Sequence, residues 1–117
     1  MNKWSDKSLL KAFRNPTVRN YRIRHIAPEV TFLGMKNQPD FARIIVTMIP
    51  SRTIMDLKAF KIYLQQFREK IISYERLINV IYNDVNDIFS PISLKIEMTT
   101  NPRGGISSIL EIDSEKL

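Results

Sequence analysis

Asp56-Leu57-Lys58-Ala59-Phe60-Lys61-Ile62-Tyr63-Leu64-Gln65-Gln66-Phe67-Arg68 is the segment around which this chain is organised. Its apolar residues recur at steps of three and four and therefore share one face of a helix: Leu57, Phe60, Leu64 and Phe67. Basic residues flank that face at helical spacing: Lys58, Lys61 and Arg68. The segment predicts an amphipathic helix that closes a core on one side and presents positive charge beside it. On most helices such a charged flank is simply solvated.

Working outward, the flanking sequence predicts two strands before this helix and two strands after a second helix. The strand patterns cover residues 21–25, 41–49, 93–98 and 106–112, and the second helical pattern covers residues 74–88. Residues 28–39 are predicted as a loop, Thr53 as the cap of the first helix, and Ser8 as the cap of a short helix near the start. The order ββααββ predicts an α+β fold with a four-stranded antiparallel sheet and both helices on one face.

The domain organisation follows from the same pattern. Residues 1–20 are predicted as a basic lead-in, residues 21–112 as a single domain, and residues 113–117 as a frayed tail. An open four-stranded sheet has two free edges, which favour pairing with another copy of the chain. The sequence therefore predicts a homo-oligomer.

Composition limits the chemistry available to the 117 residues. The chain has no cysteine, which excludes disulfides, thiolate metal sites and thiol nucleophiles, and its single histidine, His25, leaves little material for a metal site or a catalytic triad. A net charge of +6 favours polyanions or phosphorylated ligands. No apolar run approaches the roughly 18 residues of a membrane span, and the first residues lack the apolar core of a signal peptide. We therefore expect a cytoplasmic protein with no metal and no membrane partner.

Three short segments carry a resemblance to a known family. They are Gln38-Pro39-Asp40-Phe41-Ala42, the segment from Asp56 to Tyr63 with its two lysines and closing aromatic, and Asn101-Pro102-Arg103-Gly104-Gly105-Ile106-Ser107. In this order and at this spacing they resemble the 7-cyano-7-deazaguanine reductases, the QueF family of the T-fold (tunnelling-fold) superfamily, which also includes GTP cyclohydrolase I. The resemblance extends over about residues 21–112.

The resemblance implies a substrate, a cofactor and roles for particular residues. Members of the family use NADPH to reduce the nitrile of a 7-deazaguanine base to an aminomethyl group, on the way to the modified tRNA base queuosine. Glu75 corresponds to the carboxylate that anchors the base, with Tyr74 beside it, and Asp40 corresponds to the proton donor. A carboxylate suits a guanine-like edge because it can accept two hydrogen bonds.

The remaining implied residues concern the cofactor. Lys58, Lys61 and Arg103 match positions that grip the phosphates of NADPH, for which mobile ammonium groups and a planar guanidinium are suited. The resemblance also implies ligand sites between the subunits of a ring or of stacked rings.

The chain departs from the family where the chemistry takes place. The flanking residues put Gly34 at the position of the family's nucleophilic cysteine, whereas an ungapped count back from Asp40 puts Leu33 there. Tyr74 also stands where the family usually has histidine, and Asp56 replaces the more usual glutamate. Because the covalent thioimide of the family needs a thiolate, ordinary NADPH-dependent nitrile reduction is not expected.

Three functions remain open at this point. The first is a divergent enzyme that binds 7-cyano-7-deazaguanine and acts on its nitrile, in nucleobase, tRNA or DNA modification, without a cysteine. The second is a non-catalytic T-fold protein that binds a purine or a nucleic acid, or that serves in assembly. The third is binding of tRNA or DNA through basic residues near the start of the chain, which are Lys3, Lys7, Lys11, Arg14, Arg19, Arg22 and Arg24.

Overall fold

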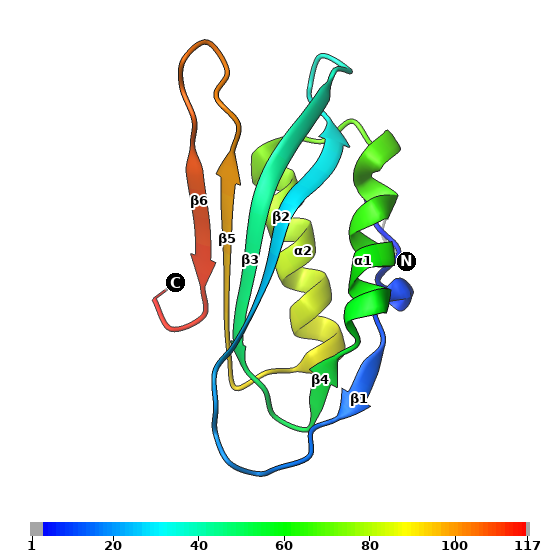
Figure 1. Ribbon diagram of the computed structural model, residues 1–117, viewed down its shortest axis with the longest axis vertical. Helices are drawn as coiled ribbons and strands as arrows, with labels where there is room; N and C mark the ends of the chain where they lie inside the picture. The colour runs from blue at the N-terminus through cyan, green and yellow to red at the C-terminus, as the bar shows by residue number, and fades with distance from the viewer. Residues whose placement is uncertain (1–3, 117) are drawn as a thin grey trace.

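A four-stranded antiparallel sheet forms the centre of the protein, in the order β2-β3-β5-β6 (Figure 1). The structure is a computed structural model that describes residues 4–116. In it β2 (Ile23–Leu33) pairs with β3 (Pro39–Ile49), β3 pairs with β5 (Ser93–Thr100), and β5 pairs with β6 (Ile109–Asp113). The predicted α+β class and the order of the four main strands are confirmed.

Two helices cover one face of this sheet (Figure 1). α1 (Leu57–Gln65) continues into the 3₁₀-helix η2 (Gln66–Glu69), and α2 (Tyr74–Phe89) runs back along the sheet. The side chain of Asp56 caps α1 by accepting a hydrogen bond from the Lys58 N–H. The prediction that Thr53 caps this helix was wrong, because Asp56 directly precedes the first helical residue.

The hydrophobic core lies between the sheet and the two helices. Alternate residues of the two central strands are buried against the helices, as the pleat of a strand requires. They are Ala42, Ile44, Val46 and Met48 of β3 and Leu94, Ile96 and Met98 of β5. Leu77, Ile81 and Val85 supply the facing surface of α2.

The apolar stripe predicted for α1 is correct at three residues and wrong at one. Phe60, Leu64 and Phe67 are buried, but Leu57 is 58% exposed, and Tyr63 is completely buried instead. Leu57 lies on the side of α1 that faces a groove along β2, whereas Tyr63 reaches α2 through its hydroxyl. The buried face of α1 is therefore rotated toward α2.

A second, two-stranded sheet ties the start of the chain to the body. β1 (Ala12–Arg14) pairs with β4 (Thr53–Met55), and the 3₁₀-helix η1 (Lys7–Leu9) precedes β1. Asp6, and not Ser8, caps η1 by accepting from the Ser8 N–H. This small sheet was not predicted, since three-residue strands carry too little periodicity to be recognised.

The loop predicted over residues 28–39 is largely strand. β2 continues through Pro28 to Leu33, with a register shift between Ala27 and Val30. Proline lacks the N–H that a central strand needs, but an edge strand with an irregular register tolerates it. The hairpin is therefore long, and only residues 34–38 turn.

The last described residues are held against the sheet. The Ser114 N–H donates to the Leu94 carbonyl and the Ser114 hydroxyl accepts from the Leu94 N–H, each at 2.9 Å. The expected fraying does not begin at Asp113, which ends β6. Within residues 4–116, no helix combines the length and the apolar character needed to cross a bilayer.

Candidate ligand-binding and catalytic cavity

A cavity of about 580 Å³ lies at one end of the molecule, where three separate segments meet. The β2–β3 turn and the β5–β6 loop lie at this end with the start of α2, which is the upper end in Figure 1. Most of the residues singled out from the sequence line this cavity together: Gly34, Asp40, Tyr74, Glu75 and Arg103. Lys36 and Ser73 add further polar groups.

Backbone hydrogen bonds place the β2–β3 turn beside the start of α2. The Leu33 N–H donates to the Lys70 carbonyl and the Ile72 N–H donates to the Leu33 carbonyl, each at 3.0 Å. The Gly34 N–H donates to the Gln38 carbonyl at 2.7 Å, which closes the turn. The end of β2 is therefore fixed to the segment that leads into α2, so the groups on both can act on one ligand.

Asp40 is the buried carboxylate of the cavity, and donors surround it. Its side chain is 3% exposed. The Phe41 N–H donates to Oδ1 at 2.8 Å, and the Tyr74 hydroxyl donates to Oδ2 at 2.5 Å. Nε of Arg103 lies 3.8 Å from Oδ2. An ionised carboxylate can accept from all three groups.

Tyr74 is held in place by packing as well as by this hydrogen bond. Its ring meets Phe32 edge to face, with ring centroids 5.7 Å apart. Burial, and then the hydrogen bond to Asp40, raise the pKa of the Tyr74 hydroxyl above its usual range. The hydroxyl therefore remains a donor at neutral pH.

Glu75 lies in the first turn of α2, with its side chain exposed on the rim of the cavity. A carboxylate is favoured there because the amino end of a helix carries partial positive charge. Ser73 caps the helix by accepting from the Arg76 N–H, which fixes the direction in which the first turn starts. Glu75 can thus meet a ligand without itself being part of the fold's interior.

Arg103 reaches the cavity from a tight turn. Its N–H and carbonyl exchange hydrogen bonds with Ile106, and between them Gly104 and Gly105 have φ values of +60° and +81°. Glycine adopts positive φ values without a steric penalty, which accounts for the glycine pair in this turn. The Arg103 side chain is 48% exposed, so it can adjust to a ligand.

The two positions considered for the missing nucleophile, Gly34 and Leu33, differ in whether they line the cavity. Gly34 lines the cavity, and the buried residues Phe32 and Gly34 lie on the same face of the strand and its extension. Leu33 points to the opposite face and is not among the residues that line the cavity.

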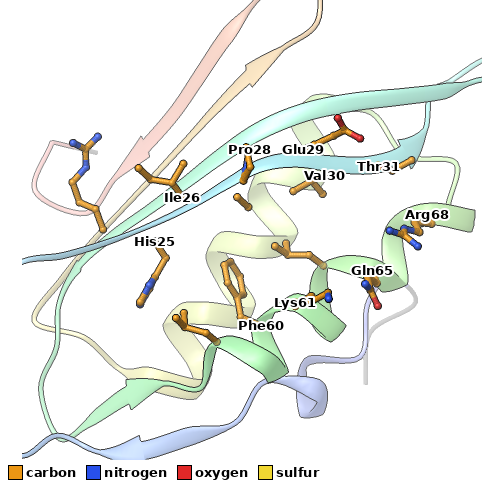
Figure 2. A pocket seen from close by; sticks show the side chains of 14 residues that line it. His25, Ile26, Pro28, Glu29, Val30, Thr31, Phe60, Lys61, Gln65 and Arg68 are labelled. Atoms are coloured by element: carbon orange, nitrogen blue, oxygen red, sulfur yellow. The ribbon is translucent and has the colours of Figure 1, made fainter.

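Lys58 and Lys61 are not brought to this cavity. Both are exposed on α1, and Lys61 lines a second hollow of about 550 Å³ between α1 and β2 (Figure 2). His25 lines the same hollow. Its Nε2 is buried with no hydrogen-bond partner in the described part of the chain, and burial lowers its pKa. The groove was not foreseen, because the sequence placed a loop where β2 forms one of its walls.

Two of the basic residues near the start of the chain lie close to acidic side chains. Lys7 pairs with Asp87 at 3.2 Å, and Arg24 approaches Glu97 at 3.9 Å. Lys3 lies outside the described residues. Among residues 4–116, no group of three histidine, cysteine, aspartate or glutamate side chains is placed to hold a metal ion.

Comparison with known proteins places this arrangement in context. A family model described as QueF-like protein matches residues 39–117. A protein of Rhodopirellula baltica named NADPH-dependent 7-cyano-7-deazaguanine reductase is 39% identical over 106 residues, which cover 89% of this chain and 88% of that protein. A protein of the same name from Wolinella succinogenes is 35% identical over 108 residues, covering 92% of this chain and 87% of the relative.

The fold is also found among solved structures. The crystal structure of the archaeosine synthase QueF-Like in the apo form superposes with a TM-score of 0.71. The match covers 84% of this chain and 95% of that chain, at 16% sequence identity. The likeness shows that the sheet and the two helices form a T-fold.

Proposed function

This chain belongs to the QueF-like family, and from that premise we propose that its cavity binds 7-cyano-7-deazaguanine and acts on the nitrile without a cysteine. The observation that carries the proposal is the convergence of Gly34, Asp40, Tyr74, Glu75 and Arg103 on one cavity, from segments almost 70 positions apart in the chain. The chain contains no cysteine, so the covalent thioimide is not available to it.

Each group has a role that suits its position. Glu75, on the rim, anchors the guanine-like edge of the base by accepting its N–H groups. Asp40, buried and tied to Tyr74, lies deeper and handles protons at the reacting group. Arg103 carries a mobile positive charge beside both.

The proposed grip on the phosphates of NADPH requires more than one copy of the chain. The relatives are NADPH-dependent by name, but here Lys58 and Lys61 lie on α1 while Arg103 lies at the cavity. The three can act on one cofactor if α1 of one copy approaches the cavity of the next. The free edges of β2 and β6 support such a homo-oligomer.

The anchoring role of Glu75 can be tested by calorimetry with 7-cyano-7-deazaguanine. Glu75→Gln removes the charge but keeps the shape, and should weaken binding by about 10- to 100-fold, as expected for a lost charge-assisted pair. Glu69→Gln, at an exposed residue of η2, is the matched control and should bind like the unaltered protein. Failure of the unaltered protein to bind the base would overturn the proposal, as would equal binding by Glu75→Gln.

A second candidate is binding without turnover, and the absence of a nucleophile favours it. In that case the oligomer holds the base, or a nucleic acid containing it, for another protein. Tight binding of the base with no chemical change after prolonged incubation, with or without NADPH, would establish this alternative in place of an enzyme. Binding of tRNA or DNA through the basic residues would instead show a steep dependence on salt.

A further inference from the structure

We propose that this site adds water to the nitrile and produces a carboxamide, with the attacking water held beside Gly34, in the space that the outer atoms of a side chain there would occupy. The proposal rests on the proposed function, because it concerns the same cavity and the same ligand. It assigns a reaction to the site, one that needs no thiol, no metal and no hydride donor.

The surroundings of Gly34 supply the first argument. A β-carbon built on Gly34 would lie 3.5 Å from the Gln38 carbonyl oxygen, 3.6 Å from Nη2 of Arg103 and 3.7 Å from Oδ2 of Asp40. These are ordinary contact distances, so a side chain would fit. Gly34 does not have a positive φ either. Neither crowding nor backbone conformation therefore demands glycine at this position.

What glycine leaves is a space beside its Cα that opens into the cavity and has polar groups around it. A bound water needs two to four polar partners, and a water just beyond the β-carbon position would have an acceptor at Gln38, a donor at Arg103 and an acceptor at Asp40 on its sides. Arg103 is half exposed on its loop and can close the remaining distance. A water that donates to both acceptors and accepts from Arg103 keeps one lone pair free for attack.

Asp40 is suited to remove a proton from that water. The described contacts of its carboxylate are with donors, namely the Phe41 N–H, the Tyr74 hydroxyl and, at longer range, Arg103. The same arrangement suits the general base of a hydration better than a general acid that must already hold a proton.

Tyr74 acts through Asp40 and is a positioning residue. Its hydroxyl donates to Oδ2, the same oxygen that faces the space beside Gly34. The other charged groups on the cavity are Glu75 and Arg103, with Lys36 on the β2–β3 turn. Of all these groups, Tyr74 and Arg103 approach Oδ2 directly, so they fix the direction of the carboxylate.

The reaction balances with water as the only co-reactant. The water oxygen forms a bond to the nitrile carbon while one π bond of the nitrile breaks and its electron pair moves to nitrogen. Asp40 takes a proton from the attacking water and returns it to that nitrogen. The imidic acid that results tautomerises to the carboxamide, and nothing is oxidised or reduced.

The experiment incubates the unaltered protein with 7-cyano-7-deazaguanine in water enriched in ¹⁸O, with and without NADPH, and identifies the product by mass spectrometry. The expected product is the base plus one water, carrying the heavy oxygen, formed at the same rate in both incubations. An aminomethyl product that requires NADPH would overturn the proposal. Binding of the base with no product would also overturn the hydration proposal, while the proposed binding of the base would remain. Failure to bind the base would overturn both the hydration proposal and the proposed function.

Variants at Gly34 test where the water stands. Gly34→Ala puts a methyl group into the space beside Gly34 and should slow hydration at least tenfold with the affinity for the base little changed. Gly34→Cys should slow it as well, and should gain the mass of the base as a covalent adduct of the protein. Thr31→Ala, on the opposite face of β2, is the matched control. Hydration by Gly34→Ala at the rate of the unaltered protein would contradict the water position.

Variants at Asp40 and Tyr74 separate the base from the residue that positions it. Asp40→Asn should lower the rate about 100-fold or more at unchanged affinity, the usual loss for a general base. Tyr74→Phe should lower kcat about tenfold with KM unchanged, since the carboxylate loses the donor that fixes its direction. An unchanged kcat would show that Tyr74 does not position Asp40, and undiminished turnover by Asp40→Asn would refute its role.

Discussion

Two buried aspartates in this molecule accept a hydrogen bond from a tyrosine, yet their surroundings differ. Tyr74 donates to Asp40 at 2.5 Å, and Tyr63 donates to Asp84 at 2.6 Å. The two aspartates are 3% and 1% exposed. The two carboxylates are therefore alike in burial and in the kind of donor, although Tyr63 is completely buried and Tyr74 only half-buried.

The difference lies in what completes each pair. Asp84, in the middle of α2, also accepts from the Ser5 hydroxyl at 2.5 Å, so it joins the start of the chain to both helices. Asp40 faces a cavity and the adjustable guanidinium of Arg103. A buried aspartate–tyrosine pair is therefore not in itself a sign of catalysis. What distinguishes the two pairs is the third group, which is a fixed hydroxyl beside Asp84 and an open cavity beside Asp40.

The largest expected contrast is in stability. Asp84→Ala leaves two buried hydroxyls without their acceptor and should lower the free energy of unfolding by about 3 kcal/mol. Asp40→Ala should cost about 1 kcal/mol, because water from the cavity can replace the lost acceptor. Urea denaturation followed by circular dichroism measures both. Equal losses would remove the distinction between the two pairs.

The tyrosines should show the same contrast at smaller scale. Tyr63→Phe removes a hydroxyl from a completely buried ring and leaves Asp84 with one donor fewer, at a cost of about 1.5 kcal/mol. Tyr74→Phe should cost about 0.5 kcal/mol, since its hydroxyl borders the cavity. The urea midpoints of the two variants measure both losses when the slope of unfolding free energy against urea concentration is the same in the two. A Tyr74→Phe loss as large as that of Tyr63→Phe would mean that the cavity is closed to solvent.

The stability of the protein at alkaline pH should also distinguish Tyr63 from Tyr74. Burial, and then the hydrogen bond to Asp84, raise the pKa of Tyr63 far above its ordinary value of 10.0. Its contribution to stability is complete below pH 10 and is lost above it, because only the unfolded chain can then release the proton. In a Tyr74→Phe background, stability should fall by up to about 1.4 kcal/mol per pH unit above pH 10, and the added Tyr63→Phe change should flatten this slope. An unchanged slope would place the titration elsewhere.

His25 extends the comparison to a half-buried ring whose Nε2 has no hydrogen-bond partner in the described part of the chain, and its effect should be the smallest. Burial lowers the pKa of His25 below 6.5. The unfolded chain therefore binds the proton more readily, so stability should fall as the pH drops below 6.5. The loss should stay under about 1 kcal/mol, since the ring is only partly buried. His25→Leu should show a flatter curve over this range, and a curve as steep as that of the unaltered protein would contradict the assignment.

Much of the fold could be predicted from the sequence, because its main elements carry strong periodicity. The helix pair and strands β3 and β5 alternate or repeat clearly enough to be placed from their apolar residues. The missed features depend on tertiary context. β2 continues through Pro28 because it is an edge strand, and β1 forms because β4 lies beside it.

The cavity was predicted differently. Gly34, Asp40 and Arg103 lie in unrelated local patterns, and no periodicity connects them. Their grouping came from the family resemblance, and the structure brings them together with Tyr74 and Glu75. The polar triangle around Gly34 could not be predicted, since it depends on the turn at Gln38 and on the side-chain direction of Arg103.

The relaxed backbone of Gly34 has an evolutionary consequence. Some glycine codons differ from a cysteine codon by a single base, and a β-carbon fits here at ordinary contact distances. If the proposed reaction holds, an ancestor and its descendant can exchange one type of catalyst for another in a single mutational step. Such a position would be a branch point, where a lineage acquires a new reaction while it keeps its ligand.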